Sequence, residues 1–175
     1  YRGQFDEQSL WASPQMVDLD GDGTLEIVQG TGNFFQDSRG EHIKVWNADG
    51  TLRMTLTARG QVYAAPLIAD LNGDGRMEIV AGTLDGYVQA WNASGQAVFS
   101  THVVPYGTTA ASFLPVTRNP TAVDIDNADG DLEILVSMGP QMVILDSNGT
   151  QITSQTRGEL VYRTYDGSPV ARDID

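Results

Sequence analysis

A short motif recurs four times along this chain at nearly even spacing. Each copy places a proline four residues before an aspartate that opens an acidic, glycine-containing loop. The opening aspartates stand 52, 54 and 49 residues apart. The four pairs are Pro14/Asp18, Pro66/Asp70, Pro120/Asp124 and Pro169/Asp173. A period near 50 residues predicts a repeat architecture in which each unit packs on its neighbours.

Every repeat carries the pattern of four β-strands. The segment before each acidic loop supplies one strand, and three apolar or alternating runs follow the loop. Those runs occupy 25–30, 42–47 and 52–57; 77–82, 87–92 and 96–101; and 132–137, 141–146 and 151–156. A turn dipeptide separates the last two runs in each repeat, as in Asp49-Gly50. No segment of 10–12 residues shows a helical apolar stripe, so an all-β fold is expected.

Four-stranded units of this length predict the blades of a β-propeller. We expect a single propeller segment with a partial blade at 1–12, blades at 13–60, 61–118 and 119–165, and the start of another at 166–175. Known propellers have roughly four to eight blades, so three blades do not close a ring. The chain is therefore expected to be a fragment or the ordered part of a larger ring. The alternative is that two copies complete one ring.

The acidic loops have the composition of cation sites. We name them loop 1 (18–26), loop 2 (70–78) and loop 3 (124–133). Oxygen ligands at alternating positions, with a glycine for the sharp turn, suit a cation that takes six to eight oxygens. The expected ligands are Asp18, Asp20, Asp22, the Thr24 carbonyl and Glu26; Asp70, Asn72, Asp74, the Arg76 carbonyl and Glu78; and Asp124, Asp126, Asp129, the Asp131 carbonyl and Glu133. These predict about three Ca²⁺ sites, one in each complete blade. Loop 3 has one extra residue, which leaves its geometry open.

The acidic loops admit interpretations other than calcium sites. An EF-hand needs a glutamate at position 12 and flanking helices, but Gln29 and Ala81 stand there and strands flank the loops. Magnesium prefers to keep several waters. Asp, Asn and Gly also favour tight turns without any metal, and this alternative stays open. If calcium does bind, it should stabilise the fold, because it is held only by the native state.

These motifs resemble the FG-GAP repeats of the integrin α-subunit propeller, and above all their bacterial relatives. The matching elements are the proline before each loop, the D-x-D/N-x-D-G-x-x-E loop, and the E-I-V-x-G-T strand at 26–31 and 78–83. The resemblance covers nearly the whole chain. It implies a propeller, usually seven-bladed, outside the cell, with calcium in its rim loops. Glutamate stands at the last loop position where integrins usually carry aspartate, and the phenylalanine-glycine part of the family name is not evident.

The charge distribution excludes several classes of function. The chain has a net charge of −13, and the three loops hold 12 of its 23 acidic residues. The ten basic residues form no patch, so nucleic acid is not an expected partner. No apolar run approaches the roughly 18 residues of a membrane span. Cysteine is absent, which excludes disulfides and thiolate metal sites.

The sequence offers no catalytic motif. It contains neither G-x-S-x-G nor H-E-x-x-H, and no glycine loop that would hold a phosphate. The two histidines, His42 and His102, lack a metal-ligand spacing and are expected to be strand or surface residues. We therefore predict no catalytic and no organic-cofactor residues, and no enzyme.

The expected function is binding or adhesion to a protein or glycan, outside the cell or on its surface. The alternatives are the propeller domain of a polysaccharide lyase, or a structural repeat of a surface filament or layer. Two insertions, 31–41 and 101–119, supply the candidate contact residues Phe34, Phe35, Arg39 and Tyr106. The equivalent residues Trp46, Trp91 and Leu145 are expected to pack between blades, as are Trp11 and Tyr63.

Overall fold

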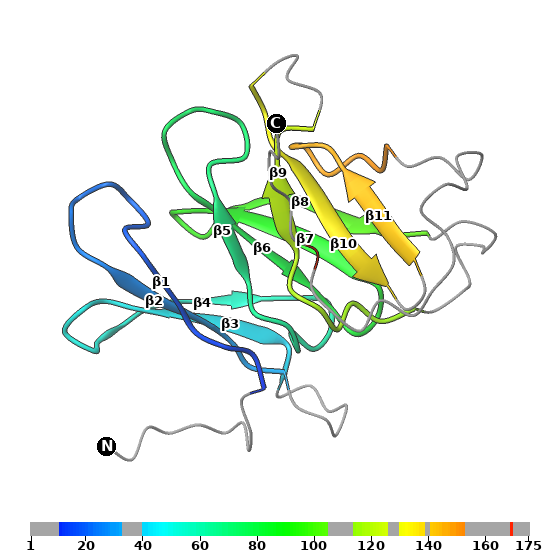
Figure 1. Cartoon of the computed structure of the whole chain (residues 1–175). Helices are drawn as coiled ribbons and strands as arrows, with labels where there is room; N and C mark the ends of the chain where they lie inside the picture. Colours follow the sequence, from blue (N-terminus) through cyan, green and yellow to red (C-terminus); the bar gives the residue numbers. More distant parts are fainter. Residues whose placement is uncertain are drawn as a thin grey trace.

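The computed structural model describes residues 11–32, 40–104, 114–125, 130–138, 141–152 and 169. These residues form eleven strands in three antiparallel sheets and contain no α-helix (Figure 1). Accordingly, none of these segments is a helix that could cross a membrane. The predicted all-β fold is confirmed.

Each sheet is one blade. Blade 1 contains β1 (Gln15–Val17), β2 (Glu26–Gly30), β3 (His42–Trp46) and β4 (Leu52–Thr57). Blade 2 contains β5 (Leu67–Ala69), β6 (Glu78–Gly82), β7 (Tyr87–Asn92) and β8 (Ala97–His102). Blade 3 contains β9 (Thr121–Val123), β10 (Glu133–Met138) and β11 (Gln141–Leu145). Consecutive strands pair within each blade.

The predicted fourth strand of blade 3, 151–156, is described only at its first two residues. Gln151 forms a bridge with Leu145, and the remainder lies outside the described residues. The fourth copy of the motif is described at Pro169 alone. The hydroxyl of Thr121 in β9 donates a hydrogen bond to the Pro169 carbonyl at 2.6 Å, so this copy begins beside the inner strand of blade 3.

Glycines close the outer hairpins of the blades. Gly50, Gly95 and Gly149 have φ of 83°, 81° and 85°, a region that residues with a Cβ rarely occupy. Each glycine amide donates to the carbonyl three residues earlier, at 2.9, 2.8 and 3.0 Å respectively. The predicted turn dipeptides are therefore the points where the chain reverses.

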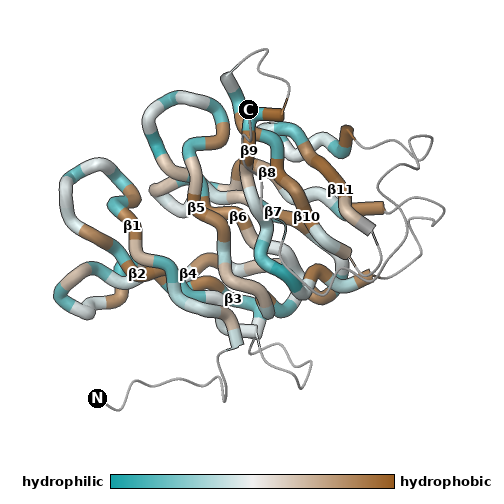
Figure 2. The backbone as a smooth tube through the Cα atoms, viewed as in Figure 1, coloured by the Kyte–Doolittle hydropathy of each residue, from teal (hydrophilic) through white to brown (hydrophobic). Residues whose placement is uncertain are grey.

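The blades stand side by side, with β5 between β1 and β9 (Figure 1). One apolar cluster joins blades 1 and 2 and includes Val28, Val45 and Ile79. A second joins blades 2 and 3 and includes Val80 and Ile134. Figure 2 shows hydrophobic stretches along β5, β10 and β11. Because each cluster draws on two neighbouring sheets, the blades share their cores as repeat units do.

The equivalent residues Trp46, Trp91 and Leu145 differ in burial. Trp91 is 4% exposed and packs in the cluster between blades 1 and 2, and Leu145 is fully buried between blades 2 and 3. Trp46 is only half-buried. By strand register, it faces the side of blade 1 that points away from blade 2. The packing prediction is confirmed for Trp91 and Leu145. For Trp46 it stays a prediction, because no described blade lies on that side.

The last predicted pair, Trp11 and Tyr63, stack with ring centroids 5.6 Å apart and planes 20° from parallel. They precede the inner strands of blades 1 and 2, so they do pack across two blades. Trp11 nevertheless remains 54% exposed. The stack therefore lies at the surface rather than in the core.

Candidate metal centre

Loop 1 is folded around the carboxylate of its first aspartate. The Oδ1 atom of Asp18 accepts hydrogen bonds from the amides of Gly21 and Asp22 at 2.8 and 3.0 Å, and Oδ2 accepts one from Gly23 at 2.8 Å. Both glycines have positive φ, 79° and 86°. The D-x-D-G-D-G composition thus produces a tight loop in which one carboxylate orders the backbone.

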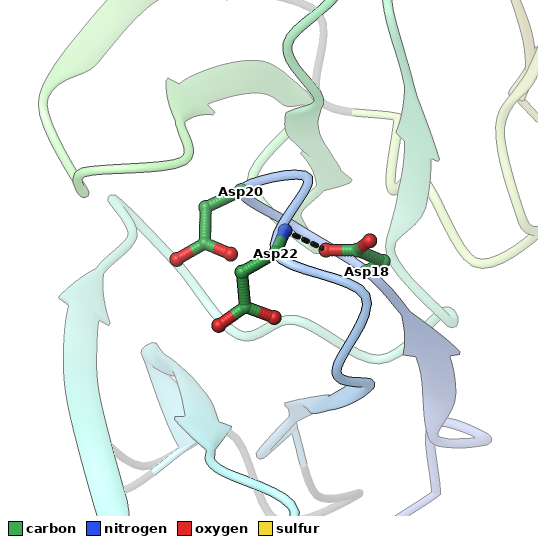
Figure 3. Close-up of side chains that lie close together, drawn as sticks. All are labelled: Asp18, Asp20 and Asp22. Carbon is green, nitrogen blue, oxygen red and sulfur yellow. Dashed lines mark hydrogen bonds between the residues drawn. The ribbon is translucent and has the colours of Figure 1, made fainter.

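The structure brings three predicted ligands of loop 1 together. Carboxylate oxygens of Asp18, Asp20 and Asp22 lie within 4.8 Å of one another. Asp20 and Asp22 are exposed, and their carboxylates extend in the same direction, whereas Asp18 is turned toward the loop backbone (Figure 3). The Thr24 amide donates to Asp22 Oδ1 at 2.7 Å. Hard oxygen atoms gathered in this way are the donor type that Ca²⁺ prefers.

Glu26, the last predicted ligand of loop 1, does not belong to this group of three. It is 2% exposed at the start of β2. Its Oε2 accepts the Leu19 amide at 3.0 Å, and its Oε1 lies 3.4 Å from Nη1 of Arg53. The carboxylate therefore ties the second residue of the loop to the following strand.

The same contact recurs in all three loops. Glu78 Oε2 accepts the Leu71 amide at 3.0 Å, and Glu133 Oε2 accepts the Ile125 amide at 2.7 Å. Like Glu26, both glutamates are buried. The repeated glutamate thus has a structural role in closing the loop, which the spacing of the motif alone did not reveal.

Loop 2 repeats the backbone arrangement of loop 1. Asp70 accepts the amides of Asp74 and Gly75 at 3.1 and 2.7 Å. Asn72 Oδ1 accepts the Asp74 amide at 3.0 Å, and Asp74 Oδ1 accepts the Arg76 amide at 2.8 Å. An amide stands here at the third position, so loop 2 has one carboxylate fewer than loop 1.

Burial changes the acidity of the glutamate in loop 2. It raises the pKa of Glu78 above its ordinary value, and the negative charges of Asp74 and Asp70 add to the rise. The Leu71 amide acts in the opposite direction. A buried charge among other carboxylates is unfavourable unless a cation accompanies it.

Loop 3 is described only in part. Asp126 and Asp129 lie outside the described residues. Asp124 follows β9, and Asp131 Oδ2 accepts the Ser147 hydroxyl at 2.7 Å. The described residues therefore do not assemble a third group of ligands.

A positively charged side chain from a neighbouring strand contacts loop 1. Nη2 of Arg53, on β4, lies 2.7 Å from Oδ2 of Asp20. This hydrogen bond is the main reason why the pKa of Asp20 lies below its ordinary value. Sequence reasoning missed this residue, since it is 33 positions from its partner.

A groove of about 350 Å³ opens between the inner strands of the blades. It is lined by 15–17, 65–68 and 119–121, one segment from each blade. The side chain of Asn119 accepts the Ala65 amide at 2.9 Å and so joins two of these segments. No local sequence pattern pointed to this groove, because it forms from three separate repeats.

The predicted contact residues Phe34, Phe35, Arg39 and Tyr106 lie outside the described residues. The two histidines are strand residues as predicted: His42 begins β3 and His102 ends β8. The His102 ring lies 4.9 Å from the ring of Tyr87.

Antiparallel blades that pack side by side along their inner strands define a β-propeller fold. Residues 70–136 match the family model described as the FG-GAP-like repeat. This match confirms the predicted family resemblance for the segment from loop 2 to β10. A search of curated proteins finds no match.

Solved propeller structures resemble the chain in fold. BBS1N, crystallised in complex with ARL6DN and soaked with lead, has a TM-score of 0.60 at 14% identity, over 84% of this chain and 43% of that one. BamB from Moraxella catarrhalis has a TM-score of 0.51 at 15% identity, over 84% of this chain and 37% of that one. The chain therefore spans less than half the length of these structures, and at such identities the likeness shows the fold alone.

Proposed function

We propose that this chain is part of a calcium-stabilised β-propeller that acts as an extracellular binding or adhesion module. The observation that carries the proposal is the group of three carboxylates in loop 1, with oxygens within 4.8 Å of one another. Loop 2 supports it with the same backbone arrangement around Asp70. Asp18, Asp20 and Asp22 would hold the ion in loop 1, and Asp70, Asn72 and Asp74 in loop 2.

The donor chemistry of the loops fits a calcium ion. All of these side chains offer hard oxygen atoms, and a carboxylate oxygen that accepts one amide retains a further lone pair. A bound divalent cation would supply positive charge that reduces the repulsion among the carboxylates. Extracellular calcium modules bind with dissociation constants of about 10⁻⁴–10⁻³ M, so even weak loops of this kind would be filled outside the cell.

Thermal unfolding in millimolar calcium and in excess chelator tests the metal part of the proposal. Millimolar calcium is about one to ten times a Kd of this size, so each site should add about 0.4–1.4 kcal/mol to the free energy of unfolding and raise the Tm. The variant Asp22→Asn/Asp74→Asn should lose most of this rise. The matched control Asp49→Asn/Asp146→Asn changes two aspartates of glycine turns instead and should retain it. An identical melt in calcium and chelator would overturn the proposal.

The binding part of the proposal rests on fold. BBS1N was solved in complex with ARL6DN, which is an instance of a related fold that engages a protein. The test is retention of the labelled chain on a glycan array and by candidate surface proteins, in calcium and in chelator. Selective retention that requires calcium would support a binding module. Retention of nothing under either condition would contradict it.

A further inference from the structure

Arg53 of blade 1 places a positive charge beside loop 1. The guanidinium of Arg53 lies 2.7 Å from Asp20 and 3.4 Å from Glu26. It therefore contacts both a carboxylate of the three-aspartate group and the buried glutamate that closes the loop. The Arg53 side chain is 26% exposed, whereas Asp20 lies at the surface, so solvent screens much of the attraction between them.

The other blades place an apolar residue where blade 1 has Arg53. Strand register aligns Arg53 with Val98 in blade 2 and Ile152 in blade 3, which are 48% and 50% exposed. The residue just before each of these positions pairs with an equivalent residue of the preceding strand. The three pairs are Leu52 with Trp46, Ala97 with Trp91, and Gln151 with Leu145. Within the described blades, the guanidinium is thus specific to blade 1.

Compared with blade 2, blade 1 has both an additional cation and an additional anion. Loop 1 has Asp20 at its third position, where loop 2 has the neutral Asn72. The combination of Asp20 with Arg53 in blade 1 therefore corresponds in charge to Asn72 with Val98 in blade 2. Arg76 in loop 2 is exposed and forms no ion pair with described residues, so it is no counterpart of Arg53.

We propose that Arg53 is an internal counter-ion of loop 1, which holds the loop without metal and weakens its affinity for calcium. This inference rests on the proposed calcium sites. Like charges repel, so a cation bound at Asp20 must share that carboxylate with the guanidinium or displace it. The hydrogen bond lost on displacement is charge-assisted and therefore among the stronger kind. Loop 2 can take up calcium without such a step.

The test is a calcium titration monitored by NMR, with separate reporter signals for each loop. The amide signals of Gly21 and Gly23 report on loop 1, and those of Gly73 and Gly75 on loop 2. Arg53→Val installs the residue of blade 2, and Arg53→Gln removes the charge with less change in length. We expect both to tighten calcium binding at loop 1 by about 1.5-fold to fivefold, the range typical of an exposed ion pair, and to leave loop 2 unchanged.

Two further measurements make the outcome decisive. The control Arg76→Val removes a loop cation that is not paired with an aspartate, and it should leave loop 1 unchanged. In chelator, Arg53→Val should unfold at a lower temperature than the parent, and calcium should restore most of the difference. Unchanged or weaker binding at loop 1 in both Arg53 variants would overturn the inference. No response of either loop in the parent protein would instead overturn the proposed function.

Discussion

The carboxylate of Glu78 accepts a hydrogen bond from the backbone amide of Leu71 at 3.0 Å. The carbonyl of Leu71 in turn accepts the amide of Leu132 at 2.8 Å. A buried side chain of loop 2 is therefore connected through the backbone of one residue, Leu71, to the end of loop 3. This chain of contacts joins neighbouring blades next to the proposed calcium sites.

Glu78→Gln should make the calcium-free protein more stable at neutral pH. Burial raises the folded-state pKa of Glu78 above its unfolded value, so the folded state binds the proton more tightly. The contribution of Glu78 to stability is then largest at low pH and is lost as pH rises through the folded-state pKa. A glutamine carries no charge, yet its carbonyl can still accept the Leu71 amide.

Thermal unfolding in chelator between pH 4 and 7.5 measures this effect. The advantage of Glu78→Gln over the parent should grow as pH rises above the ordinary glutamate range. The conservative Asp146→Asn, in the glycine turn of blade 3, serves as the control. A difference between variant and parent that does not change with pH would show that the buried charge is not the cause.

Asp70→Ala should destabilise the protein even without calcium. The Gly75 amide would lose its acceptor, and the Asp74 amide would keep only Asn72. The loss of a comparable helix cap costs about 0.5–2 kcal/mol. Asp70→Asn keeps one acceptor oxygen and should recover part of the loss. Denaturant unfolding in excess chelator measures both variants. Parental stability in Asp70→Ala would mean that the loop backbone does not depend on this carboxylate.

Strand positions were well predicted because the signals for them are local. The runs 52–57 and 87–92 coincide with β4 and β7, since alternating residues between glycine turns determine where each strand begins and ends. The burial of the tryptophans was not predictable in the same way. Trp46 and Trp91 occupy equivalent positions, and only the presence of a neighbouring blade distinguishes them.

The candidate metal site was likewise predictable only where its residues are close together in the sequence. The spacing of Asp18, Asp20 and Asp22 was sufficient to suggest that their oxygens converge, because one short loop carries all three. The role of Glu26 as a backbone acceptor and the approach of Arg53 depend on how β2 and β4 are placed. That placement follows from register and packing, which a motif of nine residues does not contain.

Trp91→Ala should destabilise the protein far more than Trp46→Ala. Truncation of a fully buried tryptophan costs about 3–5 kcal/mol, because a cavity adds to the loss of apolar burial. Trp46 is half-buried, so the surrounding solvent can fill part of the space that it leaves. Denaturant unfolding of the two variants under identical conditions makes the comparison. Equal losses would show that Trp46 is covered as fully as Trp91.

The glycine of the E-I-V-x-G strand allows the connection between blades to approach closely. A Cβ on Gly82 would lie 2.1 Å from Val116 Cγ1, and one on Gly30 would lie 2.7 Å from Val62 Cγ1. Val62 and Val116 are fully buried and belong to the segments that lead into blades 2 and 3. Both glycines are evident in the sequence. The valines that they contact are more than 30 positions away, so the close approach could not be predicted from the motif.

Gly82→Ala should therefore destabilise the protein, although alanine otherwise favours the folded state by restricting the unfolded chain. Insertion of a methyl group into a packed core costs about 1–3 kcal/mol, and here its neighbour is a branched side chain. Val116→Ala removes both Cγ atoms but keeps the Cβ, which a Cβ on Gly82 would meet at 2.6 Å. The double variant should therefore recover only part of the loss, yet still be more stable than the sum of the two single losses predicts. A double-mutant cycle by denaturant unfolding measures this coupling, which we expect to be about 0.5–3 kcal/mol. Additive losses would mean that Gly82 is required for a reason other than the approach of Val116.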